Sequence, residues 1–286
     1  MGVEPTHSSS AGIVYHDPIV RNNFVQWLKS RNYSPYYVRD ILSYLDHYVI
    51  TIKQPLDIVA LFSRVQKGKN NLIKGIRLLF NFYEILGSKK DYLDRLRKAL
   101  PKTQTGIDLK IPNENEVLSS IGKSALMPIQ YDALYNLLLD SGLRLTEATY
   151  VINTFTNAEP LNGFFRCGVA LFRGCKQSYY AHFSECTFNL IKQVKEKLGD
   201  QIASTFFDKK NVVNPKYLRK YVFGKMIELE IPESVADFIE GRVPRRVGAK
   251  HYMALARQAG NFYPKYLNHV SVLRHKLDLE RTLQLR

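Results

Sequence analysis

Apolar residues recur every three or four positions along most of the chain, which is the spacing of one face of an α-helix. In residues 18–28 this stripe follows Asp17, a residue type that caps helices, and Pro18, which suits a first helical turn. Residues 34–50, 56–66, 67–87 and 89–101 repeat the design. The pattern therefore predicts a small all-helical domain over residues 18–100.

Three other segments have different characters. Residues 1–17 are rich in Ser, Gly, Thr and Pro and are predicted to be disordered. Residues 101–114 lack helical periodicity and are predicted to form a linker. The helical pattern then resumes, with Asn115 as the expected cap, and predicts a second domain over residues 115–265. Residues 266–286 have apolar positions at roughly helical spacing and are predicted to form a C-terminal helical tail.

One stretch of the second domain has the composition of strands instead. Residues 161–184 are rich in aromatic and β-branched side chains and are interrupted by the sequence RGCKQS. This pattern predicts two strands joined at a turn that Gly174 supplies. The predicted fold class is mainly α with a small β-hairpin or sheet, divided between two domains.

Composition narrows the possible partners. The chain has 286 residues and a net charge of +15, and no run of eighteen apolar residues that would span a membrane. Residues 1–110 hold 17 basic and 9 acidic residues, and residues 111–286 hold 24 and 17. Because both parts are basic, double-stranded DNA or another long polyanion is the favoured partner. The three cysteines fit neither a disulfide framework nor a zinc site, so a cytoplasmic protein is expected.

Several cations of the second domain stand in unusual positions. Arg144 opens a predicted helix two residues after Gly142. The helix dipole is already positive there, so an arginine is favourable at this position if an anion binds. Lys176 stands in the predicted turn of the hairpin. Lys216 and Arg219 are three residues apart on a predicted helix, so they share a face.

A tyrosine lies within the last basic stretch, GRVPRRVGAKHYMALAR. Arg242 opens this stretch and Tyr252 follows ten residues later. A tyrosine with its usual pKa of about 10 becomes a nucleophile at neutral pH only if cations stabilise the phenolate or a base removes the proton. The alternative is that Tyr252 is structural, as most of the chain's 18 tyrosines must be; Tyr263 and Tyr266 are alternative nucleophiles.

The order of these residues resembles the catalytic domain of the tyrosine recombinases, or phage integrases. An arginine in SGLRLTE, a lysine in a hairpin, a basic-x-x-Arg helix, a Gly-Arg pair and a tyrosine follow one another over residues 115–260. The helical bundle before them is similar to the family's core-binding domain. The family usually has His at the position of Lys216, and His or Trp at that of Arg242. These replacements resemble integrases of archaeal viruses and plasmids, of the spindle-shaped-virus type.

The resemblance implies a site-specific recombinase that cuts and rejoins DNA without a metal or nucleotide cofactor. Three arginines would bind the scissile phosphate, and a tyrosine would attack it to form a 3′-phosphotyrosine link. A lysine would protonate the leaving 5′-oxygen, and four protomers would assemble on two duplexes as a homotetramer. The residues implied are Arg144, Arg219 and Arg242 for the phosphate, Tyr252 as the nucleophile, Lys176 as the proton donor and Lys216 as its assistant.

Some questions stay open from the sequence. Arg173 lies three residues before Lys176 and competes with it as the catalytic cation of the hairpin. Two other functions remain: a type IB topoisomerase-like enzyme that nicks and closes DNA, and a DNA-binding protein without catalysis. The first domain would contact phosphates, which positions a protein on DNA without reading its sequence. The candidates for those contacts are Lys67, Lys69, Lys74 and Arg77.

Overall fold

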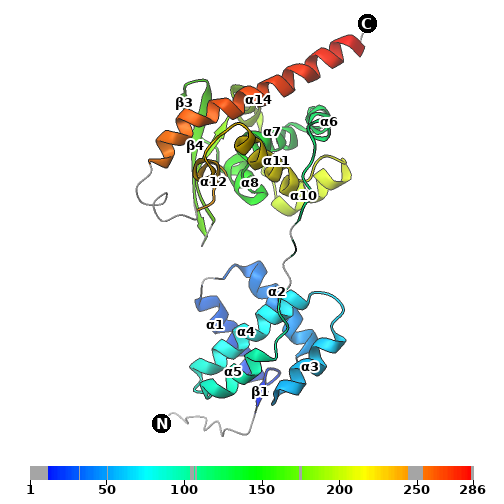
Figure 1. Ribbon diagram of the computed structural model, residues 1–286, viewed down its shortest axis with the longest axis vertical. Helices are drawn as coiled ribbons and strands as arrows, with labels where there is room; N and C mark the ends of the chain where they lie inside the picture. The colour runs from blue at the N-terminus through cyan, green and yellow to red at the C-terminus, as the bar shows by residue number, and fades with distance from the viewer. Residues whose placement is uncertain are drawn as a thin grey trace. The chain divides into compact units, whose positions relative to one another are not determined.

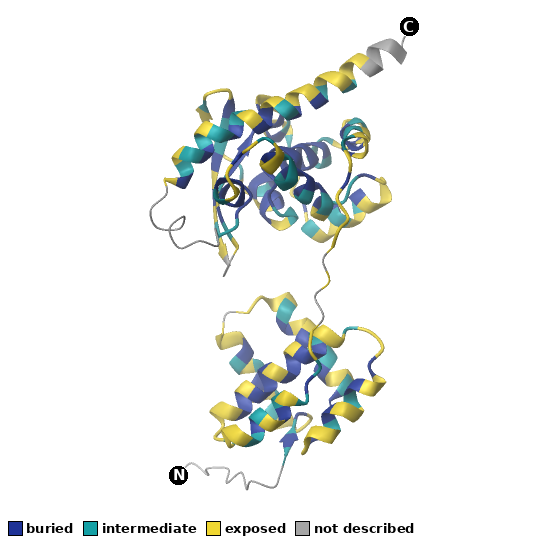
Figure 2. Ribbon diagram, in the orientation of Figure 1, coloured by how far each residue is buried: buried dark blue, intermediate teal, exposed yellow. Residues whose placement is uncertain are grey.

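The structure of the protein, a computed structural model, is mainly helical, with small antiparallel sheets. This confirms the predicted fold class. The chain divides into two compact units, Met1–Ile107 and Asp108–Arg286, called here the N-terminal unit and the C-terminal unit (Figure 1). Buried residues form a core within each unit (Figure 2). The residues that the structure describes are 12–31, 33–49, 51–103, 106, 108–173, 176–243 and 254–284.

The N-terminal unit is a bundle of helices that begin where the sequence places their caps. The Asp17 side chain accepts hydrogen bonds from the backbone N–H groups of Ile19 and Val20, and the Ser34 side chain accepts one from Tyr37. No helix in the described parts of the chain is long and apolar enough to cross a membrane. The helices of this unit are α1 (Pro18–Ser30), α2 (Pro35–Tyr48), α3 (Pro55–Arg64), α4 (Lys69–Ile85) and α5 (Lys90–Lys98).

The prediction that residues 1–17 are disordered is wrong for the six of them, 12–17, that the structure describes. Strand β1 (Ile13–Val14) pairs with β2 (Thr51–Ile52) in an antiparallel ladder. The hydroxyl of Tyr83 bonds to both the N–H and the C=O of Val14, at 2.9 and 2.8 Å. The polar composition of the segment hides a short apolar stretch, Ile-Val-Tyr, which the bundle buries.

The C-terminal unit is built around α7 (Ile129–Ser141), which is buried from Asp132 to Ser141. Helices α8, α9, α11 and α6 and strand β5 all contact it. The unit's other helices are α6 (Glu114–Ser124), α8 (Leu145–Thr154), α9 (Glu185–Gln193), α10 (Asp200–Lys209), α11 (Pro215–Glu228), α12 (Glu233–Ile239) and α14 (Leu255–Gln284).

The predicted hairpin is present. Strands β4 (Phe164–Arg173) and β5 (Lys176–Phe183) pair antiparallel, with Arg173 opposite Lys176, while the predicted turn residue Gly174 lies outside the described residues. Sequence reasoning missed a third strand, β3 (Glu159–Leu161), which pairs with the outer edge of β4.

Two predicted boundaries need correction. Helix α6 is capped by Asn113 and not by Asn115: the Asn113 side chain accepts a hydrogen bond from the backbone N–H of Glu116, and the Glu116 carboxylate accepts one from the backbone N–H of Asn113, at 2.9 and 2.8 Å. Helix α14 runs without a break through residue 265, so no separate tail begins at residue 266. Its apolar stripe continues across that position and packs on α12 and α6 of the same unit (Figure 1).

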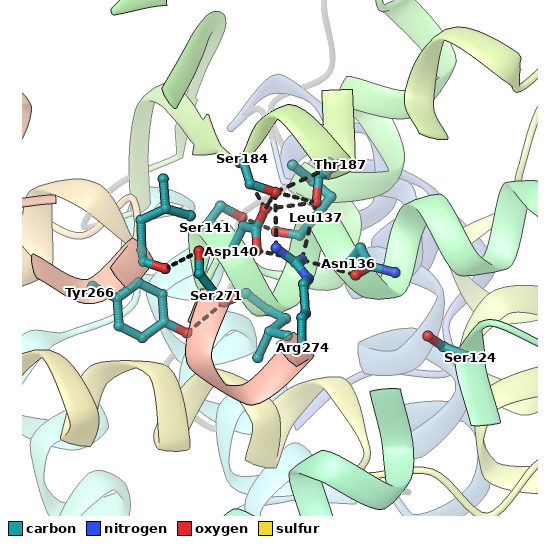
Figure 3. Close-up of polar contacts among 12 residues, drawn as sticks. Ser124, Asn136, Leu137, Asp140, Ser141, Ser184, Thr187, Tyr266, Ser271 and Arg274 are labelled. Atoms are coloured by element: carbon teal, nitrogen blue, oxygen red, sulfur yellow. Dashed lines mark hydrogen bonds and ion pairs between the residues drawn. The ribbon is translucent and has the colours of Figure 1, made fainter. Parts of the chain in front are cut away.

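A buried polar network fastens α14 to α7 (Figure 3). The Arg274 guanidinium donates to the Asp140 carboxylate and to the side-chain oxygen of Asn136, at 2.8 and 2.9 Å. The Asp140 carboxylate also accepts hydrogen bonds from Ser184 and Thr187 of the β5–α9 junction. Because buried charges are stable only when paired and hydrogen-bonded, this network fixes where α14 lies on the unit.

We predict that Arg274→Leu loosens α14 strongly, because the substitution leaves the fully buried Asp140 without its cation. Breaking such a pair costs about 3–5 kcal/mol of opening free energy. Hydrogen–deuterium exchange of the α14 amides measures that free energy. The matched control is Lys276→Leu on the same helix, whose pair with Glu114 is exposed and contributes about 1 kcal/mol or less. Equal exchange in the two variants would contradict the prediction.

Candidate active site

Arg219 is the centre of a group of charged side chains where several elements of the C-terminal unit end. It lies on the buried face of α11, and its Nη1 donates to the carbonyl oxygens of Gly142 and Glu240, both at 2.7 Å. Gly142 ends α7, and Glu240 ends α12. Burial lowers the pKa of Arg219 to about 10, so the guanidinium keeps its charge at neutral pH.

Arg144 stands at the N-terminus of α8, as predicted, and its guanidinium reaches Gly241, the residue after Glu240. Its Nη1 donates to the Glu147 carboxylate at 2.8 Å and to the carbonyl oxygen of Gly241 at 2.9 Å. Its backbone N–H donates to the same carboxylate at 3.1 Å. Glu147 therefore holds both the start of α8 and the guanidinium that precedes it.

Arg242 is the residue after Gly241 and makes three contacts that fix its position. Its backbone N–H donates to the carbonyl oxygen of Asp237, at 2.7 Å. Its Nη2 lies 2.8 Å from a carboxylate oxygen of Glu240, and its guanidinium lies over the ring of Phe223. About a third of the side chain stays exposed, so a ligand can reach it. Arg144, Arg219 and Arg242 are called the arginine cluster below.

The hairpin reaches the arginine cluster through the backbone. Lys176, the first residue of β5, forms an antiparallel bridge with Arg242, and the N–H of Gln177 donates to the Gly241 carbonyl at 3.2 Å. Lys176 is exposed, so its amine is open to a ligand. The side chain of Arg173, the competing cation, lies outside the described residues. The choice between them stays a prediction in favour of Lys176.

Lys216 has a different partner from Arg219, although both lie on α11. Its amine forms an ion pair with Asp108 at 2.7 Å, and Lys220 pairs with the same carboxylate at 3.0 Å. These two amines, that of Lys216 first, hold the pKa of Asp108 below its usual range. The structure therefore brings together the three predicted arginines and the backbone of Lys176, but not the amine of Lys216.

The predicted nucleophile, Tyr252, lies outside the described residues, two positions before Ala254. The alternative tyrosines are described and are poorly suited to attack. Tyr263 and Tyr266 are fully buried, and their hydroxyls donate to backbone carbonyls of α7 at 3.1 and 2.7 Å. Burial raises the pKa of both phenols well above the usual value, so neither forms a phenolate readily.

Sequence reasoning missed two carboxylates of the site, those of Asp237 and Glu240. Glu240 has no exposed surface, and Asp237 lies 3.7 Å from Nη1 of Arg242. Together with Glu147 they place three carboxylates against three guanidiniums. Burial raises the pKa of Glu240 to about 7, although the arginines oppose the rise. Asp237 and Glu240 lie four residues and one residue before Gly241, and nothing in this local sequence marks them as site residues.

The other predicted contacts lie in the N-terminal unit. Four cations, Lys67, Lys69, Lys74 and Arg77, are exposed on α4 and the loop before it, where they are free to meet phosphates. Among the described residues no group of His, Cys, Asp or Glu is arranged to hold a metal ion.

Comparisons with known proteins identify a family and similar solved structures. The model of a family described as archaeal phage integrase matches residues 109–269, which include all six predicted catalytic positions. No curated protein sequence matches the chain. Two similar solved structures are an integrase from mycobacterium phage Brujita and XerA recombinase. The first is 10% identical, with a TM-score of 0.39, and covers 87% of this chain and 93% of its own. The second is 14% identical, with a TM-score of 0.36, and covers 88% and 96%.

Because the family model spans more than half of the chain, the chain belongs to the archaeal phage integrase family. The resemblance to the tyrosine recombinases is thereby confirmed, and the function is site-specific DNA recombination. Neither the topoisomerase-like alternative nor the DNA-binding protein without catalysis is favoured.

We predict that Gly142→Ala destabilises the C-terminal unit because it displaces the Glu240 carboxylate. Gly142 has a φ of +62°, and an added Cβ would lie 2.8 Å from Glu240 Oε1 and 2.9 Å from Val222 Cγ1. Such overpacking costs about 1–3 kcal/mol beyond the backbone strain. The control is Gly163→Ala, with a φ of +83° and open space around the added Cβ. Urea unfolding followed by circular dichroism measures both, and equal losses would refute the prediction.

Proposed function

We propose that the arginine cluster binds the scissile phosphate of one DNA strand and that Tyr252 attacks its phosphorus. The observation that carries this proposal is the convergence of three guanidiniums on residues 240 and 241, directly after α12. Arg144 and Arg219 donate to the carbonyl oxygens of Gly241 and Glu240, and Arg242 pairs with the Glu240 carboxylate. Guanidiniums stay charged and present parallel donors, which suits the nonbridging oxygens of a phosphate. The fixed partners of each arginine support preorganisation, because little has to rearrange when the phosphate arrives.

The proposed reaction exchanges one ester for another. The phenolate oxygen of Tyr252 bonds to phosphorus, the bond from phosphorus to the 5′-oxygen breaks, and the leaving oxygen takes up a proton. The products are a 3′-phosphotyrosine link and a free 5′-hydroxyl. A 5′-hydroxyl from a partner strand reverses the step and rejoins the DNA. Negative charge grows on the nonbridging oxygens in the transition state. Each guanidinium is therefore expected to lower the activation free energy by about 3 kcal/mol.

Lys176 is the proposed proton donor to the 5′-oxygen. Its support is the backbone bridge to Arg242, which places the Lys176 backbone beside that of an arginine of the cluster, together with the exposure of its side chain. Lys216 is proposed to assist after it leaves Asp108. That ion pair is exposed, and exposed pairs contribute about 1 kcal/mol or less, so a DNA phosphate can compete for the amine.

The wider assembly follows from the charge of the chain. With a net charge of +15, the protein is proposed to contact duplex DNA through both units, with the cations of α4 as phosphate contacts in the first. Strand exchange between two duplexes needs four cleavage sites, so a homotetramer on DNA is proposed. We propose that the protein comes from a virus or plasmid of an archaeon and acts in the cytoplasm of the host, because the chain belongs to the archaeal phage integrase family.

We predict that Tyr252→Phe abolishes covalent attachment to DNA, because the phenol oxygen is the atom that bonds to phosphorus. The measurement is an SDS-resistant protein–DNA adduct on a pool of nicked duplexes with randomised sequence, and sequencing of the captured DNA also gives the target. The matched control is Tyr263→Phe, which removes a hydroxyl that is buried against α7 and should keep the adduct.

An adduct that survives Tyr252→Phe would reject this assignment of the nucleophile. The captured sequence then serves in two further assays, plasmid relaxation and recombination between two sites. Recombination by the wild-type protein supports the proposal, whereas relaxation alone would establish the topoisomerase-like alternative.

A further inference from the structure

Glu240 is the most deeply placed ionisable group of the site, and the reaction described above does not use it. Its side chain has no exposed surface. One carboxylate oxygen, Oε2, lies 2.8 Å from Nη2 of Arg242 and 3.4 Å from Nη2 of Arg219. Neither carboxylate oxygen makes a hydrogen bond to any residue that the structure describes, and the same is true of Nη2 of Arg219. Buried polar atoms around this carboxylate therefore lack hydrogen-bond partners among the described residues.

Charged groups face Glu240 from several elements. Arg219 reaches it from α11, Arg144 from the start of α8, and Asp237 and Arg242 from its own helix and the residues after it. Tyr266 of α14 also feels its charge but is buried and neutral. The three cations favour the ionised carboxylate, whereas burial and Asp237 favour the protonated form.

A phosphate in the arginine cluster competes with Glu240 for the same two guanidiniums. A phosphodiester carries one negative charge, and the transition state of the proposed reaction carries more. The phosphate and the Glu240 carboxylate would share the same guanidiniums in a partly desolvated site, so the two anions would repel each other strongly. Because Glu240 is fixed in the core, it cannot swing into water to relieve this repulsion. The response that the surroundings allow is uptake of a proton by its carboxylate.

We propose that Glu240 is a positioning residue that holds Arg219 and Arg242 in place without DNA, and that phosphate binding to the arginine cluster is coupled to protonation of its carboxylate. The proposal deepens the proposed function, because it rests on the arginine cluster being a phosphate site. It adds no covalent step: one proton moves from solvent to the carboxylate when the phosphate binds, and returns when the phosphate leaves.

The coupling has a defined direction. Below pH 7 the carboxyl is largely neutral, since burial places its pKa at about 7, and the guanidiniums are available to a phosphate. Above pH 7 the carboxylate is ionised and competes. Phosphate affinity therefore falls as the pH rises through 7, by at most about tenfold in total when binding raises the carboxyl pKa by about one unit.

The test follows the Glu240 carboxyl by NMR in the full-length protein labelled with ¹³C in glutamate side chains. Glu240→Gln identifies the resonance by its loss. The probe is dimethyl phosphate, a diester that keeps a single charge from pH 5 to 9, and sodium chloride at equal ionic strength is its control. The expected result is titration of Glu240 near pH 7 in chloride and a rise of about one unit in its pKa in the probe.

A second measurement follows binding of dimethyl phosphate between pH 6 and 8.5, by chemical-shift perturbation of the arginine side chains. Wild-type affinity should fall several-fold over this range, and that of Glu240→Gln should stay level. Titration of Glu240 with the exposed glutamates, or no response to saturating probe, would overturn the proposal. Because the probe needs neither Tyr252 nor a cleavage sequence, this outcome is distinct from a failure of the adduct assay.

Discussion

The buried guanidinium of Arg219 is the interaction on which the rest of the site depends. It bonds to the carbonyls of Gly142 and Glu240, and thereby ties the end of α7 and the end of α12 to α11. Arg144 and Arg242 each follow two residues after one of these carbonyls. Their backbones are therefore positioned by the same guanidinium that joins them in the proposed phosphate site. A buried cation without such partners costs several kcal/mol, so the fold and the site require the same contacts.

The second constraint is electrical. Three guanidiniums in one small region would repel one another, and the carboxylates of Glu147, Asp237 and Glu240 offset that repulsion while no DNA is bound. Such an arrangement keeps the cations fixed before the substrate arrives, which is the condition for stabilising a transition state without reorganisation. If the proposed phosphate binds there, the buried carboxylate competes with it for the same guanidiniums. A Glu240 carboxyl that can take up a proton would allow both states. It is ionised and pairs with the arginines in the free protein, and it is neutral when the proposed phosphate is bound.

Local patterns were enough to predict most helices, their caps at Asp17 and Ser34, the hairpin, and the position of Arg144 at a helix start, because each depends on neighbours in the sequence. The groups that pair with the cations could not be predicted from local sequence. Lys216 shares a helix face with Arg219 by spacing, yet it pairs with Asp108, 108 residues away. Glu240 acquires its role only because α12 ends against α7 and α11. Its sequence neighbourhood resembles that of any acidic helix end, so nothing local distinguishes it.

In the proposed site, three guanidiniums converge on a single phosphate. The most direct measurement is a crystal structure of the Tyr252→Phe protein bound to a DNA duplex captured by the wild-type protein as a covalent adduct. The account predicts one phosphate whose nonbridging oxygens lie within about 3.2 Å of donors on Arg144, Arg219 and Arg242, with the ring at position 252 facing the phosphorus. DNA bound with its backbone away from these arginines, while Arg219 and Arg242 remain closed on Glu240, would contradict it.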